Sequence, residues 1–111
     1  MVSKGRRGGA LAATACLILA ARASAASPYV PGMSCEQVGG FAAAVVVAKK
    51  LGDSKKQQIS DMRQSIGHYP DTQHALAAII SGIYDDPKMR AASPDAAQSA
   101  YKRACHLWEG R

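Results

Sequence analysis

The residues of this 111-residue chain with the most versatile chemistry are its three cysteines and three histidines. Cys35 and Cys105 lie far apart, and Cys16 falls in an apolar stretch near the amino terminus. In an oxidising compartment Cys35 and Cys105 make an even pair, and we predict a disulfide between them. Such a bridge closes a loop of about 70 residues and contributes roughly 4 kcal/mol in the chain-entropy account. Two free buried thiols are the alternative, whereas a zinc site would need further cysteines close to each sulfur.

The histidines, serines and carboxylates show no arrangement typical of a catalytic or metal site. His68 and His74 are separated by a predicted turn, at a spacing that does not place two ligands on one helix face. His106 follows the cysteine that we expect in the disulfide. No serine lies in a Gly-x-Ser-x-Gly elbow, and the acidic pair 85–86 precedes a proline, which is typical of a helix end. We therefore expect no catalytic residue, no metal site and no cofactor.

Basic side chains cluster around one predicted turn, where four lysines flank Gly52. They are Lys49, Lys50, Lys55 and Lys56. Four ammonium groups converging at one corner would attract an anionic surface, such as lipid headgroups or an acidic protein. The alternative is a solvated corner whose charge is partly offset by Asp53. The sequence therefore indicates a possible contact with an anionic partner here.

The first 25 residues have the pattern of a secretory signal. Lys4, Arg6 and Arg7 provide a basic start, residues 10–21 are apolar, and Ala23-Ser24-Ala25 is a small-x-small cleavage site. We predict export by a Sec-type route to the periplasm or the medium, with cleavage after Ala25. The mature chain would then be residues 26–111, which is 86 residues.

A lipoprotein is the alternative interpretation of the same segment. Cleavage before Cys16 would use Ala13-Thr14-Ala15 as the lipobox. That box lacks the usual leucine at its first position, and the apolar run continues beyond the cut. Cleavage after Ala25 is therefore the interpretation that we adopt.

The charge of the remaining chain argues against a nucleic-acid partner, and its hydropathy argues against a membrane-spanning helix. The formal net charge of +6 falls to about +2 after cleavage, because four basic residues leave with the signal. This excess is too small to indicate nucleic acid. No segment after the signal reaches the ~18 apolar residues of a membrane-spanning helix. We expect a soluble mature protein, and its oligomeric state stays open.

Apolar periodicity and capping signals predict an all-α domain of four short helices over residues 34–111, preceded by an extended, loose arm at 26–33. The start signals are Ser34, Ser54, Asp71 or Thr72, and Ser93, and the stop signals are Gly52, Gly67, Asp85-Asp86-Pro87 and Gly110. Ser34 and Ser54 each begin a capping-box pattern. No alternation typical of a strand appears in the sequence.

The apolar faces of these helices predict how they pack. The first is apolar over most of its circumference, which is typical of the central, most buried helix. Gly39 and Gly40 would let a neighbouring helix approach it closely. The second has a narrow face and the third a strong isoleucine stripe. The inner face of the fourth is expected from Ala97, Ala100, Tyr101, Ala104 and Trp108, with Trp108 the most exposed aromatic residue.

The outline of the mature chain resembles small exported proteins of unknown function from Gram-negative bacteria. The shared marks are Cys35 near the start, Cys105 near the end, Ile83-Tyr84 at a helix exit and Ser93-Pro94 at a helix start. In size, helical content, signal and single disulfide the chain is also similar to periplasmic acid-stress chaperones, although its cysteines are much farther apart. This resemblance transfers no functional residue.

These features together favour a non-enzymatic, exported interaction protein that presents a helical face to a protein or envelope partner. The second hypothesis is an acid- or stress-activated chaperone that opens to expose Ile79, Ile80, Ile83 and the valines of the first helix. The third is a small metal carrier or an enzyme, for which the sequence offers the least support.

Overall fold

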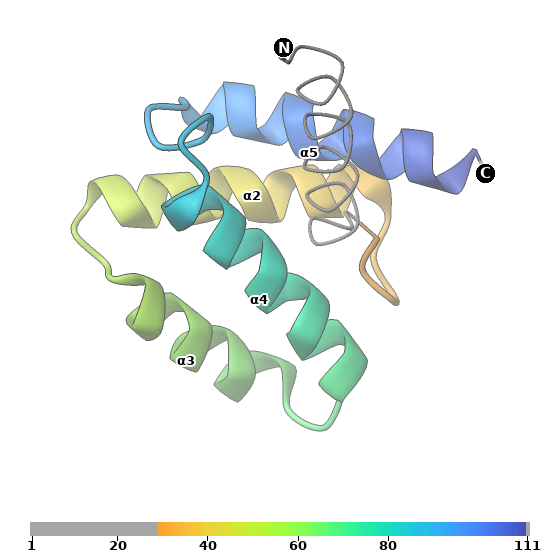
Figure 1. The fold of residues 1–111 in the computed structure, drawn as a ribbon. Coiled ribbons are helices and arrows are strands. Elements are labelled where there is room, and N and C mark those ends of the chain that lie inside the picture. Colours follow the sequence, from red (N-terminus) through yellow and green to blue (C-terminus); the bar gives the residue numbers. More distant parts are fainter. Residues whose placement is uncertain (1–28, 111) are drawn as a thin grey trace, which may run out of the picture.

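The computed structural model describes residues 29–110, which form the four predicted helices (Figure 1). The helices are α2 (Cys35–Lys50), α3 (Lys55–Ile66), α4 (Pro70–Asp85) and α5 (Pro94–Glu109). This part of the chain contains no strand, and the all-α prediction is confirmed. The predicted signal segment and the lipoprotein alternative at Cys16 lie outside the described residues.

The helix starts follow the serine capping signals, with one difference. The Ser34 side chain accepts a hydrogen bond from the Gln37 backbone N–H, and the Gln37 side chain accepts one from the Ser34 backbone N–H, which completes the capping box. At Ser54 only the first of these bonds forms. The Gln57 side chain donates instead to Asp61 one turn later, so half of the second predicted box is wrong.

The start of α4 corrects a second prediction. Neither Asp71 nor Thr72 caps this helix, which begins at Pro70 after Tyr69 and has no side-chain cap. Proline suits the first helical position, because its fixed φ matches a helix and its missing N–H would have no partner there. The Thr72 hydroxyl is thereby free to donate to the backbone oxygen of Pro31 at 3.1 Å. This bond ties the segment before α2 to α4.

Residues 29–33 are packed, in contrast to the loose arm that we expected. Val30 is fully buried, and its backbone oxygen accepts a hydrogen bond from Met33 across a turn. Tyr29 stacks on Trp108 of α5 with ring centroids 4.6 Å apart. A fully buried valine and an aromatic stack give this segment apolar contacts with the helices.

Helix α2 is central, as its composition predicts. Figure 1 shows α5 lying antiparallel beside α2, while α3 and α4 form a hairpin whose α4 arm crosses α2. The largest buried side chains of the core come from α2, α4 and the segment before α2: Val30, Val38, Leu76, Ile79, Ile80 and Ile83. Within the described helices, none is long and apolar enough to cross a bilayer.

Two predictions about α5 and the aromatic residues need correction. Ala100 is exposed, so the inner face of α5 rests on Ala97 and Cys105, with Tyr101 half-buried. Tyr69 in the turn before α4 is 68% exposed and Trp108 only 39%, because Trp108 is partly covered by Tyr29. The most exposed aromatic residue of the described chain is therefore in the α3–α4 turn.

Candidate interaction surface

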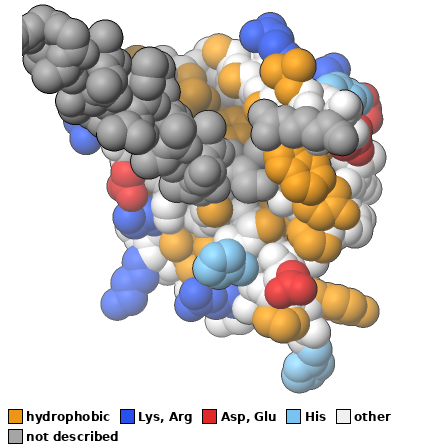
Figure 2. All heavy atoms as spheres, turned by 45° about the vertical axis from the view of Figure 1, so that its right-hand side comes forward, with side chains coloured by type: hydrophobic (Ala, Val, Ile, Leu, Met, Phe, Trp, Pro, Cys, Tyr) orange, Lys and Arg blue, Asp and Glu red, His pale blue; other side chains and the backbone are white. Residues whose placement is uncertain are grey.

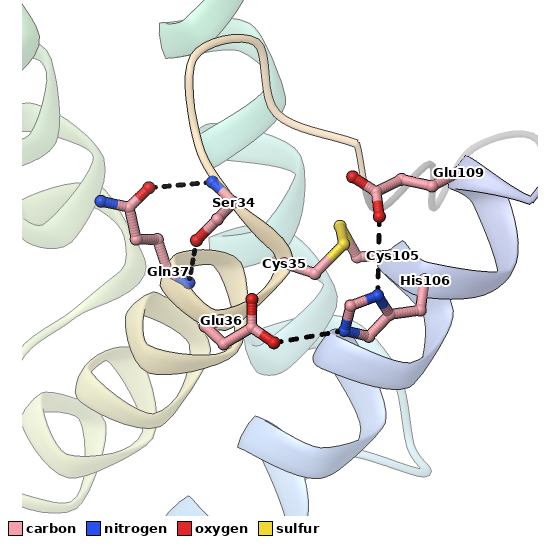
Figure 3. The surroundings of a disulfide bond; sticks show 7 residues. All are labelled: Ser34, Cys35, Glu36, Gln37, Cys105, His106 and Glu109. Carbon is pink, nitrogen blue, oxygen red and sulfur yellow. Dashed lines mark hydrogen bonds and ion pairs between the residues drawn. A yellow bond between two sulfur atoms is a disulfide. The ribbon is translucent and has the colours of Figure 1, made fainter.

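The disulfide joins the first residue of α2 to the end of α5 (Figure 3). Cys35 and Cys105 are both buried, and their Cα atoms lie 5.4 Å apart. The pairing predicted from the sequence is therefore present in the structure. The disulfide fixes the carboxyl-terminal part of α5 to the start of α2.

Next to the disulfide, an exposed histidine lies between two carboxylates. Figure 3 shows His106 Nε2 directed at Glu36 and His106 Nδ1 at Glu109, with distances of 3.4 and 3.5 Å to the nearest oxygens. The Glu36 backbone N–H donates to its own carboxylate and lowers the pKa of Glu36 below its ordinary value, and the contact with His106 acts in the same direction. This cluster links the first turn of α2 to the last turn of α5.

The same corner brings three metal-ligand types together. Ligand atoms of Cys35, His106 and Glu109 lie within 4.8 Å of one another. The Cys35 sulfur, however, is bonded to Cys105, and zinc is bound by a deprotonated thiolate. The sequence did not predict this cluster, because its members are brought together only by packing of the two helices. In the disulfide form the cluster therefore offers no free thiolate.

The four lysines are not equivalent in the structure. Lys49 Nζ donates to the backbone oxygens of Ile83 and Arg90, each at 3.3 Å, and Lys55 pairs with Asp85 at 2.8 Å. Both lysines therefore bind around the carboxyl end of α4, where a helix dipole favours cations. Lys50 and Lys56 are exposed. Of the four lysines predicted to contact an anionic partner, Lys50 and Lys56 are therefore the two whose ammonium groups are directed to solvent rather than to α4.

The remaining sequence candidates for chemistry lie apart from this corner. His68 and His74 are exposed near the α3–α4 turn. Ser65 lines a groove, whereas Ser81 is half-buried on α4. The positions of these four residues add no support to the third hypothesis, an enzyme or a metal carrier.

A groove of about 500 Å³ opens between α2, α3 and α4. Most of its lining is apolar, and it includes Met33, Phe41, Ala48, Met62, Ile66 and Ile80. Two carboxylate residues, Asp53 and Asp61, belong to the same groove. We call it the α2 groove, and it exists because α3 packs mainly on α4 and leaves part of α2 uncovered.

Next to this groove, α2 presents a row of apolar residues to solvent. Gly40, Ala44, Val47 and Leu51 recur at spacings of three and four residues, which places them on one side of a helix. All four are exposed, Val47 by 46% and Leu51 by 81%. We call this row the α2 face. On the side of the molecule that Figure 2 draws, other hydrophobic side chains also reach the surface among charged ones.

The α2 face was not recognised in the sequence. Apolar residues over most of the circumference of α2 predicted the most buried helix, and no charged residue between Gly40 and Val47 marked which side would stay open. Only the packing of the other helices defines it. One signal in the sequence could have indicated it: α2 has more apolar positions than a single neighbouring helix can cover.

Comparisons with known proteins do not assign the chain to a family. No protein-family model matches the chain, and neither a curated protein nor a solved structure gives a match.

Proposed function

We propose that this chain is an exported, non-enzymatic interaction protein that binds a protein or envelope partner through the α2 face and the adjoining α2 groove. The observation that carries the proposal is an apolar helix with one side left open. A helix that is hydrophobic all round is usually covered all round, and contiguous exposed apolar surface marks interaction sites. Val47 and Leu51 are the most exposed large side chains of this face.

Export to the periplasm or the medium is part of the same proposal. It is supported by the basic start, the apolar run and the small-residue cleavage site within residues 1–25, and by a buried disulfide, which persists in oxidising compartments. The resemblance in outline to small exported bacterial proteins is consistent with it. The intact mass of the exported protein should start within two residues of Ala26, and a mass that still contains Met1 would contradict export with cleavage.

Binding rather than catalysis is favoured by the mainly apolar lining of the α2 groove, where the carboxylate residues Asp53 and Asp61 have no histidine beside them among the lining residues. Glu36, His106 and Glu109 converge next to a closed disulfide, are about half or more exposed, and do not face the α2 groove. A general acid or base acts within hydrogen-bond reach of a bound substrate. The groove itself offers mainly apolar surface, which suits recognition of an apolar side chain or segment.

Site-specific photo-crosslinking in producing cells tests this function. A photoreactive residue at position 51 should form a discrete adduct with a partner, because Leu51 belongs to the α2 face. The matched control carries the same residue in place of Leu107, another exposed leucine, on α5. Adducts at position 51 that are absent at 107 support the proposal. Equal or absent crosslinking at both positions would reject the α2 face as the binding surface.

An acid-activated chaperone is the second candidate, and one feature of the fold favours it. Ile79, Ile80 and Ile83 are buried on α4, which lies in the hairpin between the two helices that the disulfide joins. Opening this hairpin would expose the isoleucines while α2 and α5 stay linked. Dye binding and suppression of client aggregation should then rise as the pH falls from about 7 to about 2. A domain that stays closed and inactive over this range would eliminate the chaperone.

A further inference from the structure

The partner of the α2 face follows from the distribution of small, large and charged residues along α2. We propose that it is a second copy of this chain, packed antiparallel with α2 against α2 around a two-fold axis near Ala44. This inference rests on the proposed function, because it names the occupant of the same surface. Three independent features of α2 support a self-complementary contact.

The first feature is the spacing of small residues. Gly40, Ala44 and Ala48 recur every fourth residue along α2. A β-carbon added at Gly40 would meet no atom within 4 Å, so the backbone there is open to a neighbour. Small residues at this spacing allow two helix backbones to approach closely. In an antiparallel pair centred on Ala44, Gly40 of one copy lies opposite Ala48 of the other.

The second feature is a projecting side chain at one end of the face and a hollow at the other. Leu51 is 81% exposed just after α2, while Met33 and Phe41 line the α2 groove near the start of the helix. The antiparallel arrangement places Leu51 of each copy near residues 37–41 of the other, which is this end of the groove. An isologous contact requires such mutual complementarity between one surface and itself.

The third feature is charge. Glu36 lies in the first turn of α2 and Lys50 in the last, and both are exposed. At 100° per residue they fall on the same flank of the α2 face. Antiparallel packing brings Glu36 of one copy, whose carboxylate also contacts His106 of its own chain, near Lys50 of the other, twice per pair, and aligns the helix dipoles favourably. Parallel packing would bring like charges together, so charge selects the antiparallel arrangement.

Sedimentation velocity of the purified, oxidised protein over a range of concentrations tests the inference. The parent protein should sediment with the mass of two copies. The variants Val47→Asp and Ala44→Arg should each sediment with the mass of one. Ala100→Arg is the matched control, because Ala100 is exposed on α5 and away from the α2 face; it should leave the mass unchanged. Circular dichroism verifies that each variant keeps its helices.

A charge exchange tests the direction of packing. Glu36→Lys and Lys50→Glu should each weaken self-association by about 10-fold, since two pairs per dimer turn repulsive, and the double exchange should restore it. A single-copy mass at all concentrations, or a dimer insensitive to both Val47→Asp and Ala44→Arg, would overturn the inference. If the protein is single-copy yet position 51 still crosslinks to another protein, the proposed function survives and only the identity of the partner fails.

Discussion

The two sides of helix α2 are built from similar residues but are used differently. On one side, Gly39 lets α5 approach so closely that an added β-carbon would lie 2.8 Å from the backbone oxygen of Gln98. On the other side, Gly40 meets nothing within 4 Å, and Val47 and Leu51 reach solvent. This difference shows that apolar residues on a helix surface do not by themselves determine which element covers that surface. The α5 side is covered within the chain, whereas the α2 face is exposed to solvent.

The largest expected effect comes from breaking the covalent link on the α5 side. Replacing Cys35 and Cys105 together by alanine should lower the free energy of unfolding by about 4 kcal/mol, because the unfolded chain loses a constraint that closes a loop of 70 residues. Urea denaturation of the variant and of the oxidised parent measures the difference. Equal midpoints and slopes would show that the disulfide contributes nothing to holding α5 on α2.

The two adjacent glycines give the sharpest contrast between the sides. Gly39→Ala should destabilise the domain by about 1–3 kcal/mol, since its β-carbon would overlap the α5 backbone. Gly40→Ala should instead stabilise a single copy by up to about 1 kcal/mol through helix propensity, while weakening self-association. Thermal or urea unfolding in a Val47→Asp background isolates the single copy.

The contrast fails if the two alanine variants change stability in the same direction and by similar amounts. Such a result would mean that α5 yields easily at Gly39, or that Gly40 is packed against something within the chain. Either outcome would remove the distinction between a filled and an open side of α2.

A smaller effect is expected where α2 reaches the end of α4. Lys49→Met should cost about 1–2 kcal/mol, because its ammonium group donates to two backbone oxygens near the carboxyl end of α4. Lys50→Met, one residue away and exposed, should stay within about 0.5 kcal/mol of its parent when both lysine variants are measured in the single-copy Val47→Asp background. Chemical denaturation of the two variants compares them, and equal losses would argue that Lys49 acts only through general surface charge.

The smallest effect concerns acid. The folded-state pKa of Glu36 lies below its ordinary value of 4.5, so its contribution to stability is present above that pH and is lost as the pH falls through the folded value. Glu36→Gln removes this contribution, and stability should therefore fall less steeply below about pH 4.5 than in the parent. Melting temperatures measured across this range provide the comparison. Superimposable profiles would show that Glu36 does not link α2 and α5 in a pH-dependent way.

Local signals in the sequence were sufficient for the helices but not for the surfaces they form. Serine caps, a proline start at Ser93-Pro94 and glycine stops act within one turn, and they located the helices to within a few residues. The start of α4 was missed because Tyr69, which makes no side-chain cap, holds the N-cap position and Pro70 begins the helix. The roles of Lys49 and Lys55 could not be predicted, since their partners Ile83 and Asp85 are 34 and 30 residues away.

The α2 face could not be predicted from the sequence for a related physical reason. Helical periodicity distinguishes a polar side from an apolar one, but α2 is apolar around its circumference and offers no such contrast. Which of its sides stays open depends on where α3, α4 and α5 pack. The disulfide, in contrast, was predictable because assigning Cys16 to the predicted signal leaves Cys35 and Cys105 as one even pair.

The most direct test of the central claim is the reactivity of a single thiol placed on each side. Val47→Cys puts a thiol on the α2 face, away from the two-fold axis, and Ala100→Cys puts one at an exposed position of α5, with Cys35 and Cys105 occupied in the disulfide. Maleimide labelling of the protein in the cells that produce it should be several-fold slower at position 47 than at position 100, and equal after unfolding. Equal labelling rates in the native protein would show that the α2 face is uncovered and would contradict its assignment as a binding surface.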